Sequence, residues 1–484
     1  MDNNVEERLL TSEVENASLK ERVWIESKKI WRVGFAGIIA RVTQFGIIVV
    51  TQSFIGHINE LDLAAYAIVQ TIGVRFVNGI LLGMASATET LCGQAFGAGQ
   101  HHMMGIYLQR SWIVDFVTAT ILLPVFIFAT PIFKLLGEEE DIATEAGHIS
   151  LWFIPFIYNF VFGLTIQMYL QAQSKNMVIA WLSAFSFCFH VLLSWIFVSK
   201  LSLGIPGAMG ALIISSWLVV IGEFVYILGG WCPLSWKGFT LAAFHDIFPV
   251  VKLSISSGIM LALELWYYAI LVLVAGYVTD AEVAISAFSI CLNINAWEFM
   301  IALGFLGASC VRVSNELGSG NAEAAKFSMK VTLVTSVSIS LFFSILCLLF
   351  GRNLAYLFTS EDEVAAEVSS LSALLALTIL FNGIQPVLTG IAIGAGLQTM
   401  VAYVNLFCYY VIGVPIGVLL GYVADLKVKG IWIGLICGVV AQTLVLGFLI
   451  LRVDWNEQVK KASDRLNRWL LKPEEESNHS SNSA

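Results

Sequence analysis

The chain is 484 residues long, with 58% hydrophobic residues, 13% charged residues and a formal net charge of −9. A soluble globular protein carries about 25% charged residues, so this composition excludes an ordinary soluble domain. The apolar residues lie in long runs, many of them close to the roughly 20 residues that a helix needs to cross a bilayer. The sequence therefore predicts an all-α polytopic membrane protein, whose partners include the lipid bilayer and no nucleic acid.

The hydrophobic runs predict about twelve transmembrane helices, arranged as two six-helix lobes. The spans lie near residues 34–56, 63–91, 111–132, 148–170, 177–199, 206–229, 250–276, 283–309, 327–350, 368–395, 399–422 and 430–452. The predicted parts of the chain are a cytoplasmic N-terminal segment (1–32), an N-terminal lobe (33–230), a cytoplasmic linker (231–249), a C-terminal lobe (250–452) and a cytoplasmic tail (453–484).

Basic residues gather at both ends of the predicted bundle. Lys28, Lys29 and Arg32 precede the first span, and Lys460 and Lys461 follow the last one. By the positive-inside rule, both termini are expected in the cytoplasm. The N-terminal residues are polar and acidic, which is not the pattern of a cleaved signal peptide or an Arg-rich transit peptide.

The first two spans carry polar residues that share helix faces. Arg41 and Gln44 lie together in the first span, and Arg75 and Asn78 lie together in the second, followed by Glu89. An ionisable group at mid-bilayer depth costs about 2.5–3.5 kcal/mol, so such groups face a cavity or a partner. Arg41, Gln44, Arg75 and Asn78 are therefore predicted to line a substrate cavity, and the alternative is that Arg75 and Glu89 only pair across helices and stabilise packing.

One polar segment occurs twice in the chain. Residues 83–100 align with residues 304–321 at an offset of about 220 positions. A repeated half in a membrane protein indicates two pseudo-equivalent bundles with a site at their interface, as in many secondary transporters. Because each half holds an even number of spans, the pseudo-two-fold axis is expected to run along the membrane normal.

The seventh span contains a carboxyl group among aromatic residues. Glu264 is followed by Tyr267 and Tyr268, three and four residues later and so on the same helix face. Burial in such surroundings strongly alters the proton affinity of a carboxyl group. Glu264 is predicted as the proton-coupling residue, with both tyrosines in the cavity; the alternative is a carboxyl that stays neutral or pairs with an arginine.

Further polar residues occur in the eighth and tenth spans. Asn293, Trp297 and Glu298 are predicted to face the cavity from the eighth span, and Asn382 and Gln385 from the tenth.

Three prolines lie inside predicted spans, and each is a candidate hinge because a proline removes a backbone donor and bends a helix. They are Pro155, Pro386 and Pro415, and bends that serve packing alone are the alternative.

Searches for other chemistry find nothing in the sequence. The eight cysteines are scattered singly, and the seven histidines show no metal-ligand spacing, so no metal site is predicted. The phosphate-binding GxxxxGK[ST] loop and the HExxH and GxSxG motifs do not occur. The chain is not expected to be an enzyme or to hold a cofactor.

The tail carries a helical pattern. Val459, Leu466, Trp469 and Leu470 recur at helical spacing beside basic residues, which predicts an amphipathic helix on the cytoplasmic leaflet of the membrane. The residues after 473 are rich in Glu, Ser and Asn and are expected to be disordered.

At three segments the chain resembles the multidrug and toxic compound extrusion (MATE) carriers, in particular the plant DETOXIFICATION group. The segments are Ala87-Thr88-Glu89-Thr90-Leu91-Cys92-Gly93-Gln94-Ala95, Val311-Arg312-Val313-Ser314-Asn315-Glu316-Leu317-Gly318 and Gln385-Pro386-Val387-Leu388-Thr389-Gly390. The resemblance covers roughly residues 20–470. It implies two six-helix lobes around a V-shaped cavity and antiport driven by a cation gradient, which in plant members is usually H+.

The resemblance has two departures. Glu264 matches the acidic residue of the family's seventh span, but Asn382 stands where many plant members have an aspartate, and the first span lacks the proline of many bacterial members. The Asn form looks like the branch that handles flavonoid glycosides and like relatives proposed as vacuolar chloride conductors. With Arg41 and Arg75 retained, an anionic solute becomes more plausible than an organic cation.

Three functions from different classes follow from these observations. The first is a proton-coupled antiporter that moves an organic solute out of the cytosol, in which protonation of Glu264 breaks its contact with Tyr267 or Asn382. The second is a passive, voltage-driven anion channel in which Arg41 and Arg75 supply the field. The third, a membrane-embedded enzyme or lipid flippase, has no supporting motif.

The expected location is the vacuolar membrane, with the plasma membrane as the alternative. The expected partners are a small organic solute or anion and the bilayer, and the expected oligomeric state is a monomer.

Overall fold

The computed structural model describes residues 18–245, 247–276 and 282–469. Over these ranges it contains 12 helices that are long and apolar enough to cross a membrane. This result confirms the predicted all-α polytopic architecture.

The N-terminal half contains most of one lobe. Its helices are α2 (Leu19–Gly56), α3 (Glu60–Ile68), α4 (Arg75–Gly97), α5 (His101–Leu122), α6 (Pro124–Ile127), α7 (Ala129–Leu135), α8 (Glu140–Ala172), α9 (Met177–Ser194) and α10 (Gly204–Tyr226). Short π-helical segments η1 (Val69–Val74), η2 (Trp195–Lys200) and η3 (Ile227–Trp231) continue three of them.

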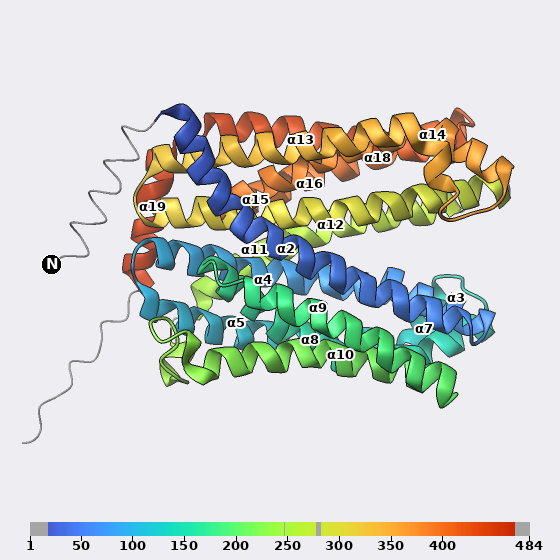
Figure 1. Cartoon of the computed structure of the whole chain (residues 1–484), viewed down its shortest axis with the longest axis horizontal. Helices are drawn as coiled ribbons and strands as arrows, with labels where there is room; N and C mark the ends of the chain where they lie inside the picture. Colours follow the sequence, from blue (N-terminus) through green and yellow to red (C-terminus); the bar gives the residue numbers. More distant parts are fainter. Residues whose placement is uncertain (1–17, 246, 277–281, 470–484) are drawn as a thin grey trace, which may run out of the picture.

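The C-terminal half contains the second lobe. It comprises a 3₁₀ turn, η4 (Leu241–Phe244), and then α11 (Phe248–Gly276), α12 (Glu282–Gly318), α13 (Ala322–Ala355), α14 (Asp362–Asn382), α15 (Gln385–Ala395), α16 (Gln398–Asn405), η5 (Leu406–Gly413), α17 (Val414–Val418), η6 (Leu419–Val423), α18 (Lys427–Arg452) and α19 (Trp455–Trp469). Helix α19 and the start of α2 lie at one end of the bundle, here named the terminal end, and α3 lies at the opposite, distal end (Figure 1).

Helix α2 begins earlier than its hydrophobic run. Ser18 caps it: the Ser18 hydroxyl accepts from the Glu21 amide at 3.4 Å, and the Glu21 carboxylate accepts from the Ser18 amide at 2.9 Å. The predicted boundary between residues 32 and 33 therefore marks no break in the structure. Hydropathy missed this first part because its charged residues do not enter a hydrophobic window.

Each lobe donates the start of one helix to the other lobe. Helix α2 packs on α12 and α13 near its start and on α9 and α10 further along, and Figure 1 shows it crossing from one group of helices to the other. In the repeated half, α11 packs on α4 and α5 in the equivalent way. The exchange ties the lobes together on both sides of the pseudo-two-fold axis.

Glycines bring the exchanged helices into backbone contact. A Cβ on Gly83 of α4 would lie 2.6 Å from the Gly258 Cα of α11, closer than real Cβ contacts. On the equivalent pair, a Cβ on Gly37 of α2 would lie 3.4 Å from the Gly304 Cα of α12. Small residues at such positions are typical of helix packing in membranes, where the apolar surroundings give no hydrophobic drive for association.

Helix α19 corrects the prediction for the tail. The helix exists, but its apolar side packs on the protein: Trp455 and Ala462 are buried among residues of the C-terminal lobe, and Leu466 among residues of the N-terminal lobe. Arg465 donates from Nη1 to the Gln94 Oε1 at 2.8 Å. The apolar face is therefore covered by protein, which a helical pattern alone does not show, and the placement of this helix at the cytoplasmic leaflet stays a prediction. Leu470 and the expected disordered end lie outside the described residues.

We expect Leu466→Ala to lower the stability of the folded protein by about 2–5 kcal/mol, because it removes a buried side chain between the lobes. The measurement is the thermal unfolding midpoint of the purified protein in detergent. Asp464→Ala, at an exposed position of the same helix, is the matched control and is expected to unfold at the wild-type temperature. Equal midpoints for the two variants would show that α19 does not depend on this packing.

Candidate functional site

A break in the tenth membrane span organises the candidate site. Helix α14 ends at Asn382, Gly383 and Ile384 form a turn, and α15 begins at Gln385. Proline lacks an N–H group, fits the first turn of a helix and disfavours helical geometry in the residue before it, so Pro386 begins the new helix. At the hinge expected at Pro386 the α-helix is thus interrupted over two residues, and a buried amide side chain lies on each side of the interruption.

The first of these amides binds the predicted proton-coupling residue. Glu264 of α11 is buried, and its Oε1 accepts a hydrogen bond from the Gln385 Nε2 at 2.9 Å. Gln385 also donates to the Thr389 Oγ1 at 3.2 Å. The second oxygen of Glu264 has no hydrogen-bond partner among the described residues. One carboxylate oxygen is therefore hydrogen-bonded, and the other is buried without a partner and can accept a proton.

The second amide binds a second buried carboxyl. The Asn382 Nδ2 donates to the Glu298 Oε2 at 2.8 Å and to the Asn295 Oδ1 at 3.0 Å. The other oxygen of Glu298 accepts from the Ser340 Oγ at 3.1 Å. Two carboxyls on different helices are thus bound by two amides that flank one helix break.

The expected partners of Glu264 need correction. Asn382 binds Glu298, as described above. Tyr267 is fully buried, its hydroxyl lies 3.0 Å from the carbonyl oxygens of both Gly434 and Leu435, and its ring stacks on Tyr409 at 4.4 Å. The structure therefore places Tyr267 in the packing between α11 and α18. Tyr268 is half-buried one residue further along.

Two aromatic contacts bridge the lobes near the carboxyls. Trp297 of α12 meets Phe45 of α2 edge to face at 5.0 Å, and Trp266 of α11 stacks on Phe76 of α4 at 4.7 Å. From their positions along these helices, Glu264 and Glu298 lie toward the terminal end from the bridges. The bridges form a layer between the buried carboxyls and the residues nearer the distal end.

Exposed polar groups from both lobes lie on the distal side of this layer. Gln52 of α2, Arg75 of α4 and Asn293 of α12 are exposed, and Asn78 of α4 is half-buried close to the layer. The π-helical segment η1 precedes Arg75, and its wider turn changes the helical register of the second span. Arg75, Asn78, Asn293 and Trp297 belong to the predicted cavity wall, and Gln52 was not part of that prediction.

Arg41 and Gln44 lie elsewhere in the N-terminal lobe. The Arg41 Nη1 donates to the Gln44 Oε1 at 3.4 Å, and Arg41 lines a small polar pocket with Gln167, Gln171 and Asn176. The predicted wall is therefore divided, with Arg41 in this pocket and Arg75 in the exposed group. Glu89 accepts from the Gln171 Nε2 of α8 at 2.7 Å, which is a contact across helices of the kind that the alternative expected for Glu89.

The two copies of the repeated segment meet at the terminal end. A Cβ on Gly97 would collide with the Asn315 carbonyl oxygen, and one on Gly93 would lie 2.7 Å from the Ser314 Cβ. Thr90 Oγ1 donates to the Ile393 carbonyl at 2.7 Å. This contact region is named the terminal gate and comprises Thr90, Gly93, Gln94, Gly97, Arg312, Ser314, Asn315, Ile393, Gly394 and Gln398.

An ion pair extends the terminal gate to the start of α2. The Arg312 Nε donates to the Glu26 Oε1 at 2.7 Å, and the same guanidinium also pairs with Glu316. On the other side, Gln94 donates to the Gly394 carbonyl at 3.1 Å. The lobes are therefore closed against each other at this end.

Pro155 and Pro415 differ from Pro386. Pro155 lies inside the continuous helix α8, and its carbonyl accepts from the Trp217 Nε1 at 3.0 Å. Pro415 lies in the first turn of α17, after the π-helical η5. Neither accompanies a break of the kind seen at Pro386.

Some residues of the site were missed by the sequence analysis. Ser340 was not singled out, although Ser336, Ser340 and Ser344 recur every four residues in an apolar span and so share a buried face. Thr90 and Gln398 of the terminal gate were not assigned a role either, although Thr90 lies in the repeated segment.

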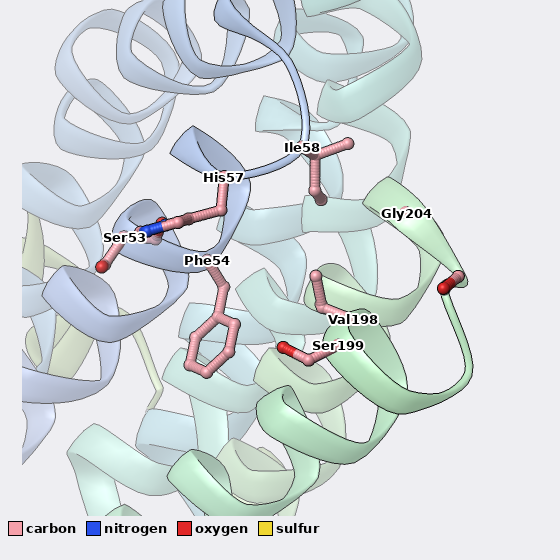
Figure 2. Close-up of a pocket in the computed structure, with 8 residues that line it drawn as sticks. Ser53, Phe54, His57, Ile58, Val198, Ser199 and Gly204 are labelled. Atoms are coloured by element: carbon pink, nitrogen blue, oxygen red, sulfur yellow. The ribbon is translucent and has the colours of Figure 1, made fainter.

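A surface pocket at the distal end contains none of the predicted site residues. It lies between the end of α2 and the α9–α10 connection, and Figure 2 shows His57, Phe54 and Ser199 along its wall. Among the described residues, no group of three His, Cys, Asp or Glu side chains could hold a metal ion.

Comparison with known proteins identifies the family. A model of the MatE family matches the chain twice, over residues 37–196 and 257–419. The chain belongs to the MatE family. The two matched segments lie in the two halves of the repeat.

Plant proteins are among the most similar MatE relatives. Protein DETOXIFICATION 24 of Arabidopsis thaliana is 51% identical over 98% of this chain and 97% of its own length. Protein DETOXIFICATION 20 of the same plant is 52% identical over 96% of this chain and 95% of its own length. The resemblance stated from the sequence motifs is therefore confirmed.

Solved structures of MATE transporters share the fold. The crystal structure of the eukaryotic MATE transporter AtDTX14 matches with a TM-score of 0.86 and 31% identity over 92% of this chain and 99% of that one. A multidrug resistance MATE transporter in an outward-facing conformation matches at 0.77 with 16% identity over 91% of this chain and 97% of that one, which shows the fold alone. The chain is an integral membrane protein and a secondary transporter of the MATE type, a family whose members are not enzymes.

We expect Gly97→Leu to open the terminal gate, because the added side chain overlaps the Asn315 carbonyl. The native Cys310 is buried in the same interface and serves as the reporter. Its labelling by a maleimide, resolved by mass spectrometry, is expected to accelerate at least about tenfold, which corresponds to about 1.4 kcal/mol.

Gly210→Leu is the matched control, since a Cβ at Gly210 meets no atom within 4 Å. Wild-type protection of Cys310 in a monodisperse Gly97→Leu protein would contradict a closed gate at this position.

Proposed function

We propose that this chain is a proton-coupled antiporter that moves an organic solute out of the cytosol by alternating access. The observation that carries the proposal is the buried Glu264, whose described partner is the uncharged amide of Gln385. A buried carboxyl without a basic partner changes the local charge when it gains or loses a proton, and this change biases one conformation over another. The driving ion in this proposal is H+.

The exposed groups near the aromatic layer suggest the chemical class of the solute. Arg75 offers a positive charge, Gln52 and Asn293 offer amide donors and acceptors, and Trp297 offers an aromatic edge. Such a set suits a solute with an aromatic body and hydroxyl or acidic groups. The proposed solutes are therefore glycosylated or acidic secondary metabolites and xenobiotics.

The proposed cycle uses the two ends of the bundle in turn. With the terminal gate closed, a proton from the distal side binds Glu264 on its unpartnered oxygen, and the solute leaves toward that side. Opening of the gate exposes the carboxyl to the cytosol, where loss of the proton restores the form that binds solute. Coupling requires that proton and solute stabilise different states, and each then weakens the binding of the other.

The proposed setting is the vacuolar membrane, with both termini in the cytoplasm and the distal end toward the acidic lumen. The plasma membrane, which also has an acidic outer side, is the alternative. Both lobes come from one chain, which supports a monomer as the working unit.

We expect Glu264→Gln to reduce pH-gradient-driven uptake at least about tenfold, because glutamine keeps the shape but carries no exchangeable charge. The measurement is uptake of a flavonoid glucoside into proteoliposomes that are acidic inside, with the pH gradient and the voltage dissipated separately. Glu363→Gln, at an exposed carboxyl of α14, is the control and should transport as wild type. Robust pH-driven uptake by the Glu264→Gln protein would refute the proposed role.

The second candidate function is a passive anion conductor. It is favoured by the exposed Arg75, for which no carboxylate partner within 4.0 Å is found among the described residues. In that case the carboxyls at the helix break would have no part in the flux.

Under this alternative, chloride current follows voltage, persists in Glu264→Gln and falls in Arg75→Ala, because the field of Arg75 attracts the anion. Currents in planar bilayers provide the measurement. Arg352→Ala is the matched control, since Arg352 is an exposed arginine at the distal end that pairs with Asp362. Flux that stops when the pH gradient is dissipated would exclude the channel.

A further inference from the structure

The break between α14 and α15 connects two carboxyls, of which the proposed cycle uses only one. Asn382 ends α14 and binds Glu298, and Gln385 begins α15 and binds Glu264. Only Gly383 and Ile384 separate the two amides. A change in the hydrogen bonding of either carboxyl therefore acts on the same two-residue turn.

The two carboxyls differ in the number of their oxygens that accept hydrogen bonds. Glu264 has one unpartnered oxygen, so a proton can bind there while the bond to Gln385 remains. Both oxygens of Glu298 accept hydrogen bonds, one from Asn382 and one from Ser340. A protonated Glu298 carries a hydroxyl that donates, and its hydroxyl oxygen is a weaker acceptor, so the hydrogen bond to that oxygen is weakened.

The amide of Asn382 is the donor whose loss has structural consequences. If the proton binds at the Glu298 Oε2, the Asn382 Nδ2 keeps its bond to Asn295, and this amide then joins the end of α14 to α12 through Asn295 alone. If it binds at Oε1, the Ser340 hydroxyl only needs to rotate. Glu298 thus has two different donors. The Ser340 hydroxyl can rotate, whereas the Asn382 amide is fixed at the end of α14.

The groups around Glu298 on each packed helix contain no basic partner. On α13, Cys347 is close enough to interact electrostatically with Glu298 and Ser340 is hydrogen-bonded to it, and on α14 the partner is Asn382. On α15, Gln385 leads to Glu264 of α11.

Helices α2 and α4 also pack on α12; Arg75 of α4 lies among the exposed groups on the distal side of the aromatic layer, and two further charged groups have other neighbours. Arg41 of α2 interacts with Gln44 and Glu89, and Glu89 of α4 is bound by Gln171. The charge of Glu298 is therefore balanced by hydrogen bonds alone among the described residues.

We propose that Glu298 is a second proton-binding residue of this transporter, which acts with Glu264 through the turn at residues 383–384. Each carboxylate binds one proton from solution and returns it as one proton, and no other group is consumed. The inference rests on the proposed proton-coupled function and places a second proton-binding carboxyl on α12. Proton binding at both sites changes the hydrogen bonds on both sides of the break.

The experiment measures proton binding directly and separately from transport. Infrared difference spectra of the purified full-length protein, recorded from about pH 5 to about pH 8, follow the carbonyl bands of buried protonated carboxyls. The wild type is expected to show several such signals, because Glu89, Asp115 and Glu223 are buried as well. Glu298→Gln is expected to remove one signal and Glu264→Gln a different one, while the remaining signals stay in both variants. Persistence of every wild-type signal in Glu298→Gln would overturn the inference.

A pair of serine variants tests the geometry without changing a charge. Ser340→Ala removes a donor to Glu298 and is expected to shift the pH midpoint of the Glu298 signal. Ser344→Ala, one turn away on α13 and bonded to the Ala376 carbonyl, is expected to leave it unchanged. Identical midpoints in Ser340→Ala and wild type would contradict the proposed contact.

The transport assay then links proton binding to coupling. Glu298→Gln is expected to lose pH-gradient-driven uptake by at least about tenfold while keeping solute exchange at equal pH on both sides. Wild-type driven uptake in this variant would overturn the inference. If the wild type itself shows no pH-driven uptake, the proposed function fails, and the infrared signal alone decides whether Glu298 binds a proton.

Discussion

Backbone-to-backbone contact between the two repeated segments is the constraint on which the rest of the structure depends. At Gly97 a Cβ would collide with the Asn315 carbonyl, and at Gly318 with the Gln94 carbonyl, so each segment can approach the other only where side chains are missing. Helices in a bilayer gain nothing from the hydrophobic effect when they meet, and close packing and hydrogen bonds must hold them. Because the segments are copies, the same contact between a glycine and a backbone carbonyl occurs twice, and the two contacts close the terminal end.

This closure arranges the polar groups in layers along the bundle. Hydrogen bonds and the ion pair of Arg312 with Glu26 occupy the terminal gate. The buried carboxyls follow, and next come the aromatic contacts that join α2 to α12 and α4 to α11. Exposed polar groups such as Arg75 lie beyond them. In the proposed cycle, a proton from the distal side passes the aromatic layer before it reaches Glu264, and the solute leaves past the same layer.

The helix break lets two amide donors reach carboxyls on two different helices. An interior carboxyl is costly unless donors satisfy it, and a continuous α14–α15 helix would carry Asn382 and Gln385 on one face, three residues apart. The turn before Pro386 lets these two amides reach different helices, toward Glu298 and Glu264. Uncharged donors hold the carboxyls in place and leave their charge free to change, which a basic partner would resist.

The sequence by itself determined the membrane-spanning helices and their duplication, and it singled out Glu264 as a carboxyl inside a span, because hydrophobic length, internal similarity and a charge in an apolar run can be read from the chain alone. Periodicity also placed Asn382 and Gln385 on a polar face. Only the tertiary structure decided that Gln385 binds Glu264, that Asn382 binds Glu298, and that the apolar face of α19 packs on the protein. The physical reason is that periodicity shows which residues share a face, whereas the partner of that face comes from helices far away in the chain.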